Sequence, residues 1–291
     1  FTLSQTTWTF SLAILMLGLS AGFLGSFAEK IGPKKSGLLA MLFWVTGLFG
    51  TAYALSVHNL TLLYLFYGII GGIGLGIGYI TPVSTLVKYF PNHPGFATGL
   101  AIMGFGFASL IAGPLMQFLV AQFGLVNNFI ILGVIYLVIM GASSLYLKAP
   151  QPKQPTRTTQ DKSTMYVHNH GMLANDAMKT WQFGALWWVF FINITCGIGL
   201  LSLASPMAQE AIGMTPTAAA SLVGIIGIFN GAGRIAWSTI SDYLGRAQTY
   251  ILFFMIEIIA FYLLAQTNSA LTFQILILLI ITCYGGGVCG L

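Results

Sequence analysis

The residue with the clearest chemistry is Arg234, an arginine inside an otherwise apolar stretch. A guanidinium keeps its charge, and burying it in hydrocarbon costs from about 3 kcal/mol upward unless it is paired or wetted. Its planar fork of donors matches a carboxylate through two parallel hydrogen bonds. Arg234 therefore indicates an anion-binding site, unless the end of its helix, about 9 Å away, is near enough for the side chain to extend to the membrane surface.

Two other polar side chains lie deep in apolar stretches. Asn230 precedes Arg234 by one helical turn, on the same face, and its amide does not take up a proton at physiological pH. Glu257 is at the centre of another apolar stretch, where it can pair with Arg234 or carry a proton. The alternative for Glu257 is a neutral, hydrogen-bonded side chain with a structural role.

Tyr79 interrupts a glycine-rich stretch, where a ring with a polar tip can project into a cavity left by small neighbours or simply pack. The four histidines lie in polar breaks and the three cysteines in apolar stretches, and neither set has the spacing of a metal site or a catalytic group. The sequence thus predicts no enzyme, no metal and no cofactor.

The composition is that of a membrane protein. Only 6% of the 291 residues are charged while 57% are hydrophobic, and the mean hydropathy is +0.87. A soluble surface needs roughly a quarter to a third of its positions charged. Soluble enzymes and nucleic-acid-binding proteins are excluded, although the net charge is +5.

Apolar runs long enough to cross a bilayer define the predicted elements. A hydrocarbon core of about 30 Å takes about 20 helical residues. Nine such runs are continuous and lack the alternation of a β-barrel strand, which predicts an all-α membrane protein with about nine transmembrane helices. The runs are approximately 8–27, 37–56, 61–87, 96–121, 126–147, 183–205, 218–240, 248–266 and 270–291.

The basic residues predict the orientation. Ten of the eleven Lys and Arg residues lie in breaks on one side of the membrane, and by the positive-inside rule that side is cytoplasmic. Residue 1 is then outside. The cytoplasmic residues are Lys30, Lys34, Lys35, Lys88, Lys148, Lys153, Arg157, Lys162, Lys179 and Arg246.

One long polar break divides the chain. Residues 148–181 are predicted to form a cytoplasmic linker between an N-terminal bundle of about five helices, 1–147, and a C-terminal bundle of about four helices, 182–291. The chain opens on a polar stretch without Met and stops inside an apolar run, so we expect it to be part of a longer protein.

A short repeat links the two bundles. Both contain a small residue, an acid four positions later, a glycine three further on and then a base, with the acids at Glu29 and Asp242. Because the repeat recurs after 242 − 29 = 213 residues, on the same side of the membrane, it predicts two homologous halves in parallel orientation.

This repeat resembles the loop signature of the major facilitator superfamily, although Glu29 replaces the usual Asp. The chain resembles most the oxalate/formate antiporter family of small-carboxylate carriers and, more distantly, the monocarboxylate transporters. The resemblance covers roughly helices 2 to 10 of 12. It is carried by four segments, and Gly113-Pro114 adds to them: Tyr89-Phe90-Pro91 with Gly95, Ala97 and Gly99; Gly104-Phe105-Gly106; Thr180 to Phe183 with Leu186-Trp187; and Phe229-Asn230-Gly231 with Arg234, leading into Ser241 to Arg246.

The resemblance implies roles for individual residues. It implies a substrate site with Arg234 on the carboxylate and with Asn230, Tyr79, Phe105 and Tyr284 around it. Monocarboxylate transporters have an Asp, implied in proton coupling, where this chain has Asn230, so the departure favours anion exchange. The resemblance also implies cytoplasmic latches that stabilise the outward-open state, formed by Glu29, Lys30, Lys35, Asp242 and Arg246.

We therefore expect a two-bundle carrier of the oxalate, formate, lactate or pyruvate class in a cell membrane, by resemblance the bacterial inner membrane. Its expected partners are the carboxylate and the lipid bilayer, with no nucleic acid, and it is expected to be a monomer. The alternatives are a carrier of another small solute, a proton-coupled monocarboxylate symporter, in which Glu257 is the possible coupling residue, and a non-transporting membrane sensor.

Overall fold

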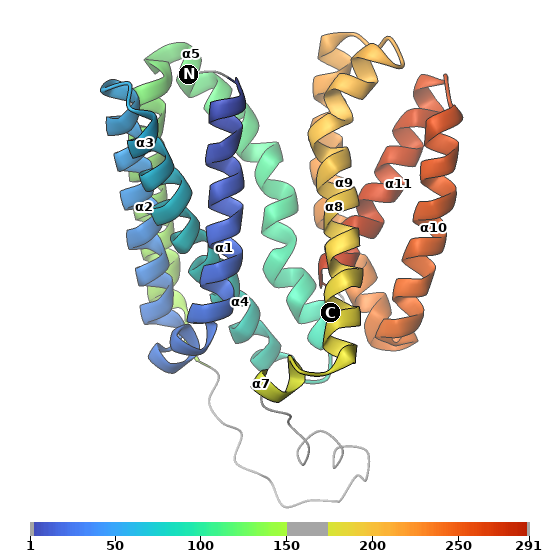
Figure 1. The fold of residues 1–291 in the computed structure, drawn as a ribbon. Coiled ribbons are helices and arrows are strands. Elements are labelled where there is room, and N and C mark those ends of the chain that lie inside the picture. Colours follow the sequence, from blue (N-terminus) through green and yellow to red (C-terminus); the bar gives the residue numbers. More distant parts are fainter. Residues whose placement is uncertain (1–2, 150–173, 290–291) are drawn as a thin grey trace, which may run out of the picture. The chain divides into compact units, whose positions relative to one another are not determined.

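The computed structural model describes residues 3–149 and 174–289 and is helical almost throughout these ranges, with no strand among them (Figure 1). The predicted all-α fold is therefore confirmed. The chain divides into two compact units, Phe1–Pro150 and Gln151–Leu291. Most of the predicted linker, residues 150–173, lies outside the described residues.

The first unit contains four long helical stretches, and the last of them, α5, has one break inside it. In α5 the backbone at Gly124 is not helical, with φ 80° and ψ 167°, and this break separates the two predicted runs that α5 holds. The elements are α1 (Leu3–Ile31), α2 (Pro33–Ser56), α3 (Leu60–Leu63), the π-helix η1 (Tyr64–Gly71), α4 (Gly72–Tyr89) and α5 (Pro94–Tyr146).

The second unit begins, in its described part, with one helical turn and continues with four long helices. Helices α9 and α11 make the most extensive contact in this unit, with α11 also packed on α8 and α10. The elements are α7 (Ala174–Ala177), α8 (Trp181–Glu210), α9 (Pro216–Leu244), α10 (Arg246–Gln266) and α11 (Ala270–Cys289).

Most of the long helices suit a bilayer in length and composition, whereas α9 is not among those that meet both criteria. Seven helical stretches of the described residues are long and apolar enough to cross a membrane. Large apolar side chains such as Trp187, Trp188 and Phe191 of α8 are exposed, as expected of helices that face lipid. The seven stretches are Gln5–Ile31, Pro33–Ser56, Leu60–Tyr89, Pro94–Tyr146, which contains the break, Trp181–Glu210, Arg246–Gln266 and Ala270–Gly287.

Local sequence explains where the helices start. Pro33, Pro94 and Pro216 occupy the first turn of α2, α5 and α9, where a missing N–H costs no hydrogen bond. The side chains of Thr180 and Thr215 cap α8 and α9 by accepting hydrogen bonds from backbone N–H groups three residues later.

The repeated signature has the same backbone in both units. Gly32 has φ 83° and ψ 160°, and Gly245, 213 residues later, has φ 86° and ψ 147°, a conformation that is essentially restricted to glycine. The next helix starts in the same way at each place, because Ser36 N donates to Gly32 O and Thr249 N donates to Gly245 O, at 3.0 and 3.2 Å. The glycine is therefore required to end one helix and begin the next.

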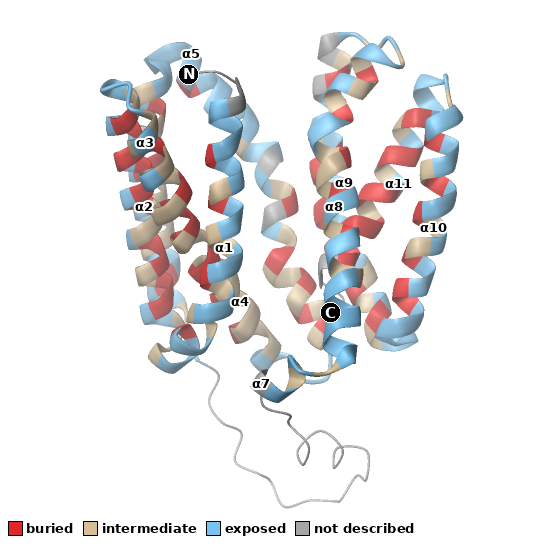
Figure 2. Ribbon diagram, viewed as in Figure 1, coloured by how far each residue is buried: buried red, intermediate tan, exposed pale blue. Residues whose placement is uncertain are grey.

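Within each unit the buried residues gather on the faces that helices share (Figure 2). In the first unit an aromatic cluster joins α2, η1 and α5, with the rings of Trp44, Tyr67 and Tyr136 in contact. In the second unit the core lies around α11, whose Ile277, Ile280 and Ile281 are fully buried.

Candidate functional site

Arg234 lies in the interior of the second unit, on α9. Its side chain is only 5% exposed, and α9 continues to Leu244, ten residues or about 15 Å further on. The predicted run ended at residue 240, so the helix is longer than expected on this side. An arginine side chain does not span that distance, so Arg234 does not reach the end of its own helix.

Asn230 holds the guanidinium. The Nε–H of Arg234 donates to Asn230 Oδ1 at 3.2 Å, and Asn230 is itself 7% exposed. The backbone carbonyl of Arg234 accepts a hydrogen bond from the hydroxyl of Ser238, one turn further on. The structure thus joins Asn230 and Arg234 by a hydrogen bond, and Ser238 adds a contact that the sequence analysis did not identify.

Helix α11 packs against this pair through glycines. A Cβ added at Gly285 would lie 2.5 Å from the carbonyl oxygen of Asn230 and 3.4 Å from the backbone nitrogen of Arg234. From the other side, a Cβ added at Gly233 would collide with the backbone of Thr282 on α11. The close approach of α9 and α11 therefore depends on glycine at both positions.

No carboxylate among the described residues forms an ion pair with Arg234. Ion pairs seen elsewhere in the described chain include Lys88–Glu29 and Lys179–Asp176. Glu257 is buried in α10, 6% exposed, in line with Tyr250 and Phe253. The pairing of Glu257 with Arg234, one of the possibilities raised by the sequence, does not occur, and within the described chain the cation has only an amide as its side-chain partner.

The three aromatic site residues belong to different units. Tyr284 is buried on α11, directly before Gly285, and its ring fills the space over Gly197 of α8. Tyr79 belongs to the first unit, where it is half-buried on α4 and lines cavities of about 320 and 230 Å³. Phe105 lies on α5, but its side chain is outside the described residues.

Of the five predicted latch residues, Glu29 has a defined partner that the sequence analysis did not predict. Its carboxylate lies 2.9 Å from Lys88 Nζ, at the end of α4, and both side chains are about half exposed. Lys30, Lys35 and Arg246 are exposed, and Asp242 is half-buried beside the glycine turn at Gly245.

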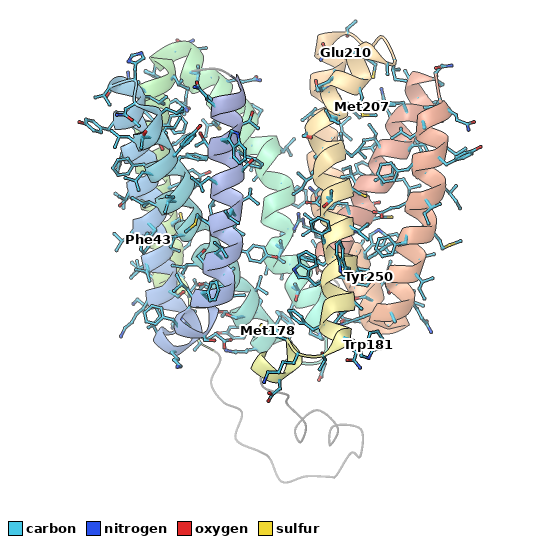
Figure 3. All side chains as sticks on the ribbon, viewed as in Figure 1. Phe43, Met178, Trp181, Met207, Glu210 and Tyr250 are labelled. Atoms are coloured by element: carbon cyan, nitrogen blue, oxygen red, sulfur yellow. The ribbon has the colours of Figure 1, made fainter. Side chains whose placement is uncertain are left out.

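A second polar group in the second unit also escaped the sequence analysis. Asn193 of α8 is 1% exposed, and within the described chain both atoms of its amide lack a hydrogen-bond partner. It lies against Gly287 of α11, whose carbonyl oxygen accepts a hydrogen bond from the hydroxyl of Tyr250. The side chain of Tyr250 is labelled in Figure 3. The sequence signal that could have identified Asn193 is a polar residue inside the apolar run 183–205.

The architecture and the site define a class: a multi-pass, all-α membrane protein of two helical units with a buried cation in one of them. The sequence comparison agrees with this class. The model of the Major Facilitator Superfamily matches residues 1–291, and the chain belongs to this superfamily. Membership of this superfamily and the transporter relatives indicate a transporter rather than an enzyme.

Three relatives illustrate what the chain is similar to. It is 28% identical to YhjX of Escherichia coli (strain K12), an uncharacterized MFS-type transporter, over 286 residues. This match covers 98% of the chain and 69% of YhjX. It is 27% identical over 254 residues to the oxalate:formate antiporter of Oxalobacter formigenes, covering 87% of the chain and 57% of the antiporter. It is 22% identical over 305 residues to the apicoplast pyruvate carrier 1 of Toxoplasma gondii, covering 84% and 54%. The chain thus spans a little over half the length of the latter two relatives.

Proposed function

We propose that this transporter carries small carboxylate anions by alternating access, with Arg234 binding the substrate carboxylate. The observation that carries the proposal is a cation buried to 5% exposure without an ion-pair partner in the described chain. Such a charge is stable in a membrane only where water or an anion reaches it. A bidentate carboxylate satisfies it best.

The substrate class is small mono- and dicarboxylates, such as oxalate, formate, lactate and pyruvate. Relatives of this chain are named for oxalate and formate exchange and for pyruvate transport. Tyr284, which is buried on α11 of the same unit, supplies an aromatic wall to this site, and the carrier works as a monomer.

The mechanism that fits the site is anion exchange. Closing the empty site would bury the charge of Arg234 with neither water nor an anion beside it, which is costly. A bound carboxylate removes this cost, so return of the carrier is faster when it holds a second anion. Asn230 supports exchange because proton coupling at this position would need a carboxylate that binds the cation in one state and a proton in the other. The amide of Asn230 bonds Arg234 but does not take up a proton.

The two repeated loops act as cytoplasmic latches. Glu29, Lys30 and Lys35 in one loop, and Asp242 and Arg246 in the other, stabilise the outward-open state by about 1 kcal/mol through helix N-termini and basic partners. The ion pair of Glu29 with Lys88 joins the C-terminal ends of α1 and α4, so this latch residue also links two helices of the first unit.

Exchange by the full-length protein in lipid vesicles tests this function. We expect vesicles loaded with formate to take up labelled oxalate at least tenfold faster than empty vesicles, with unlabelled formate or pyruvate outside competing and glycerol having no effect. Uptake that no carboxylate reduces would contradict the proposal and indicate a carrier of another solute. No uptake of any solute by correctly inserted protein would point to a sensor.

Proton-coupled symport is the second candidate, and one observation favours it. Glu257 is a buried carboxyl in the middle of α10 without an ion-pair partner in the described chain, which is how a proton-carrying residue is often placed. Under symport, carboxylate uptake acidifies the vesicle lumen and Glu257→Gln abolishes the acidification. Under exchange, as we propose, the lumen pH stays constant and Glu257→Gln transports with unchanged pH dependence.

A further inference from the structure

We propose that Asn230 is a positioning residue, which orients Arg234 so that its two terminal nitrogens, Nη1 and Nη2, form the edge that binds a carboxylate. This inference rests on the proposed function and specifies how the site recognises its substrate. It is carried by the hydrogen bond between the two side chains and by the packing of α11 against them.

The orientation of the amide follows from the chemistry of its partner. Arg234 Nε carries one N–H and can only donate, so the atom of Asn230 that faces it at 3.2 Å must be the oxygen, Oδ1. The two residues are four apart on α9, so the contact stays on one face of one helix. Movement of other helices therefore does not break it.

This bond decides which edge of the guanidinium is available. A guanidinium presents two edges with parallel N–H bonds, one formed by Nε and Nη2 and the other by Nη1 and Nη2. A carboxylate needs both N–H bonds of an edge for its two oxygens. Since Nε already donates to Asn230, the edge formed by Nη1 and Nη2 is the complete one, and the substrate approaches Arg234 end-on.

Packing keeps the amide in place. A Cβ added at Gly285 of α11 would lie 3.1 Å from Asn230 Oδ1 and 2.5 Å from its carbonyl oxygen, so the backbone of α11 covers this side of Asn230. The hydroxyl of Ser238 bonds the carbonyl of Arg234 on the following turn. Both residues are at most 7% exposed, which leaves little space for other rotamers.

An amide is suited to this task because it orients the cation without neutralising it. A carboxylate in the same place would accept the same Nε–H and also cancel the charge that attracts the substrate. Asn230 therefore gives the site direction while the charge of Arg234 is left for the anion.

Exchange kinetics of the full-length protein in vesicles test this role with two variants. In Asn230→Ala, the guanidinium loses its orientation. We expect the KM for formate to rise at least tenfold with kcat changed less than threefold. We also expect the preference for a planar anion over a spherical one, measured as the ratio of the inhibition constants of chloride and nitrate, to fall at least tenfold. A merely structural residue would not change this ratio.

Asn230→Asp keeps the shape of the side chain and adds a negative charge, so we expect the KM for formate to rise at least a hundredfold. The matched control is Asn193→Ala, which removes another buried amide of the same unit that bonds no arginine. It should keep both the KM and the anion preference of the natural protein.

The outcomes separate this inference from the proposed function. A natural protein that exchanges formate, together with Asn230→Asp or Asn230→Ala variants that keep its KM and anion preference, overturns the positioning role alone. A natural protein that exchanges no carboxylate overturns both. If Asn193→Ala loses the anion preference as Asn230→Ala does, the effect belongs to packing and the inference is again wrong.

Discussion

The α1–α4 crossing in the first unit and the α9–α11 crossing in the second are built alike. In the first, a Cβ added at Gly76 of α4 would collide with the carbonyl oxygen of Leu17 and lie 3.0 Å from the backbone nitrogen of Ala21. The glycine thus lets α4 rest directly on the backbone of α1, between two residues one turn apart.

The second crossing repeats this arrangement with different side chains. Gly285 of α11 rests between the carbonyl oxygen of Asn230 and the backbone nitrogen of Arg234. These residues lie 230 − 17 = 213 and 234 − 21 = 213 positions after their counterparts, the same interval that separates the two signature glycines. Where the first unit has a leucine and an alanine, the second has an amide and a cation.

The difference separates scaffold from chemistry. Buried polar side chains of the first unit, within the described residues, are hydroxyls and the amide of Asn128, whereas the second unit buries Arg234 and Glu257. One helix crossing has thus been used twice as a framework, and only one copy carries charge. Four substitutions, two at the crossings and one elsewhere in each unit, test this comparison in order of decreasing expected effect.

The largest expected effect comes from the crossing glycines. Gly76→Ala and Gly285→Ala should each destabilise the protein by about 1–3 kcal/mol, because the added methyl overlaps a backbone oxygen that cannot move freely. Thermal unfolding in detergent measures this as a midpoint lowered by several degrees.

The control for both is Gly224→Ala on α9, where an added Cβ meets nothing within 4 Å and alanine is the better helix former. Its midpoint should not fall. If only one of the two crossing variants is destabilised, the two crossings are not equivalent.

An intermediate effect, of opposite sign, is expected at Asn193. The amide is buried without a hydrogen-bond partner in the described chain, so replacing it with an apolar side chain of similar size removes a desolvation cost. We expect Asn193→Leu to raise stability by about 1 kcal/mol, read as a higher unfolding midpoint. A lower midpoint would show that the amide has a partner in the folded carrier.

The smallest effect is expected at the pair of Glu29 and Lys88. Both side chains are about half exposed, and exposed ion pairs contribute roughly 0–1 kcal/mol. Lys88→Gln should shift the unfolding midpoint by no more than about a degree or two, less at high salt. A loss comparable to that of Gly76→Ala would mean that this pair is a main stabiliser of the first unit.

Sequence patterns predicted what depends on chain-local information. The apolar runs, the place of Arg234 inside one of them and the recurrence of a glycine at Gly32 and Gly245 all follow from residue type and spacing. The pairing of Glu29 with Lys88 did not, because it joins residues 59 apart through tertiary packing. The same holds for the contact of Gly285 with Asn230, since a glycine pattern does not state which helix approaches it.

Helix ends and helix type were also harder to predict. The predicted run ended at residue 240 because the apolar pattern stops there. Helix α9 instead continues through Ser241 and Asp242 to Leu244 and ends at the glycine turn. The π-helix Tyr64–Gly71 has no signal in the apolar pattern, and it occurs where α2 approaches closely enough that a Cβ at Gly47 would lie 2.9 Å from Phe66 O. Both features depend on packing between helices.

The most direct test of the central claim places the residues of the first crossing into the second. The double variant Asn230→Leu/Arg234→Ala reproduces the pair Leu17 and Ala21 at an equivalent crossing, so it should insert into the membrane and unfold at a temperature no lower than that of the natural protein. The measurement is oxalate–formate exchange by the full-length protein in vesicles. We predict a loss of at least a hundredfold with folding intact, whereas exchange at the natural rate would show that the buried cation is not the carboxylate site.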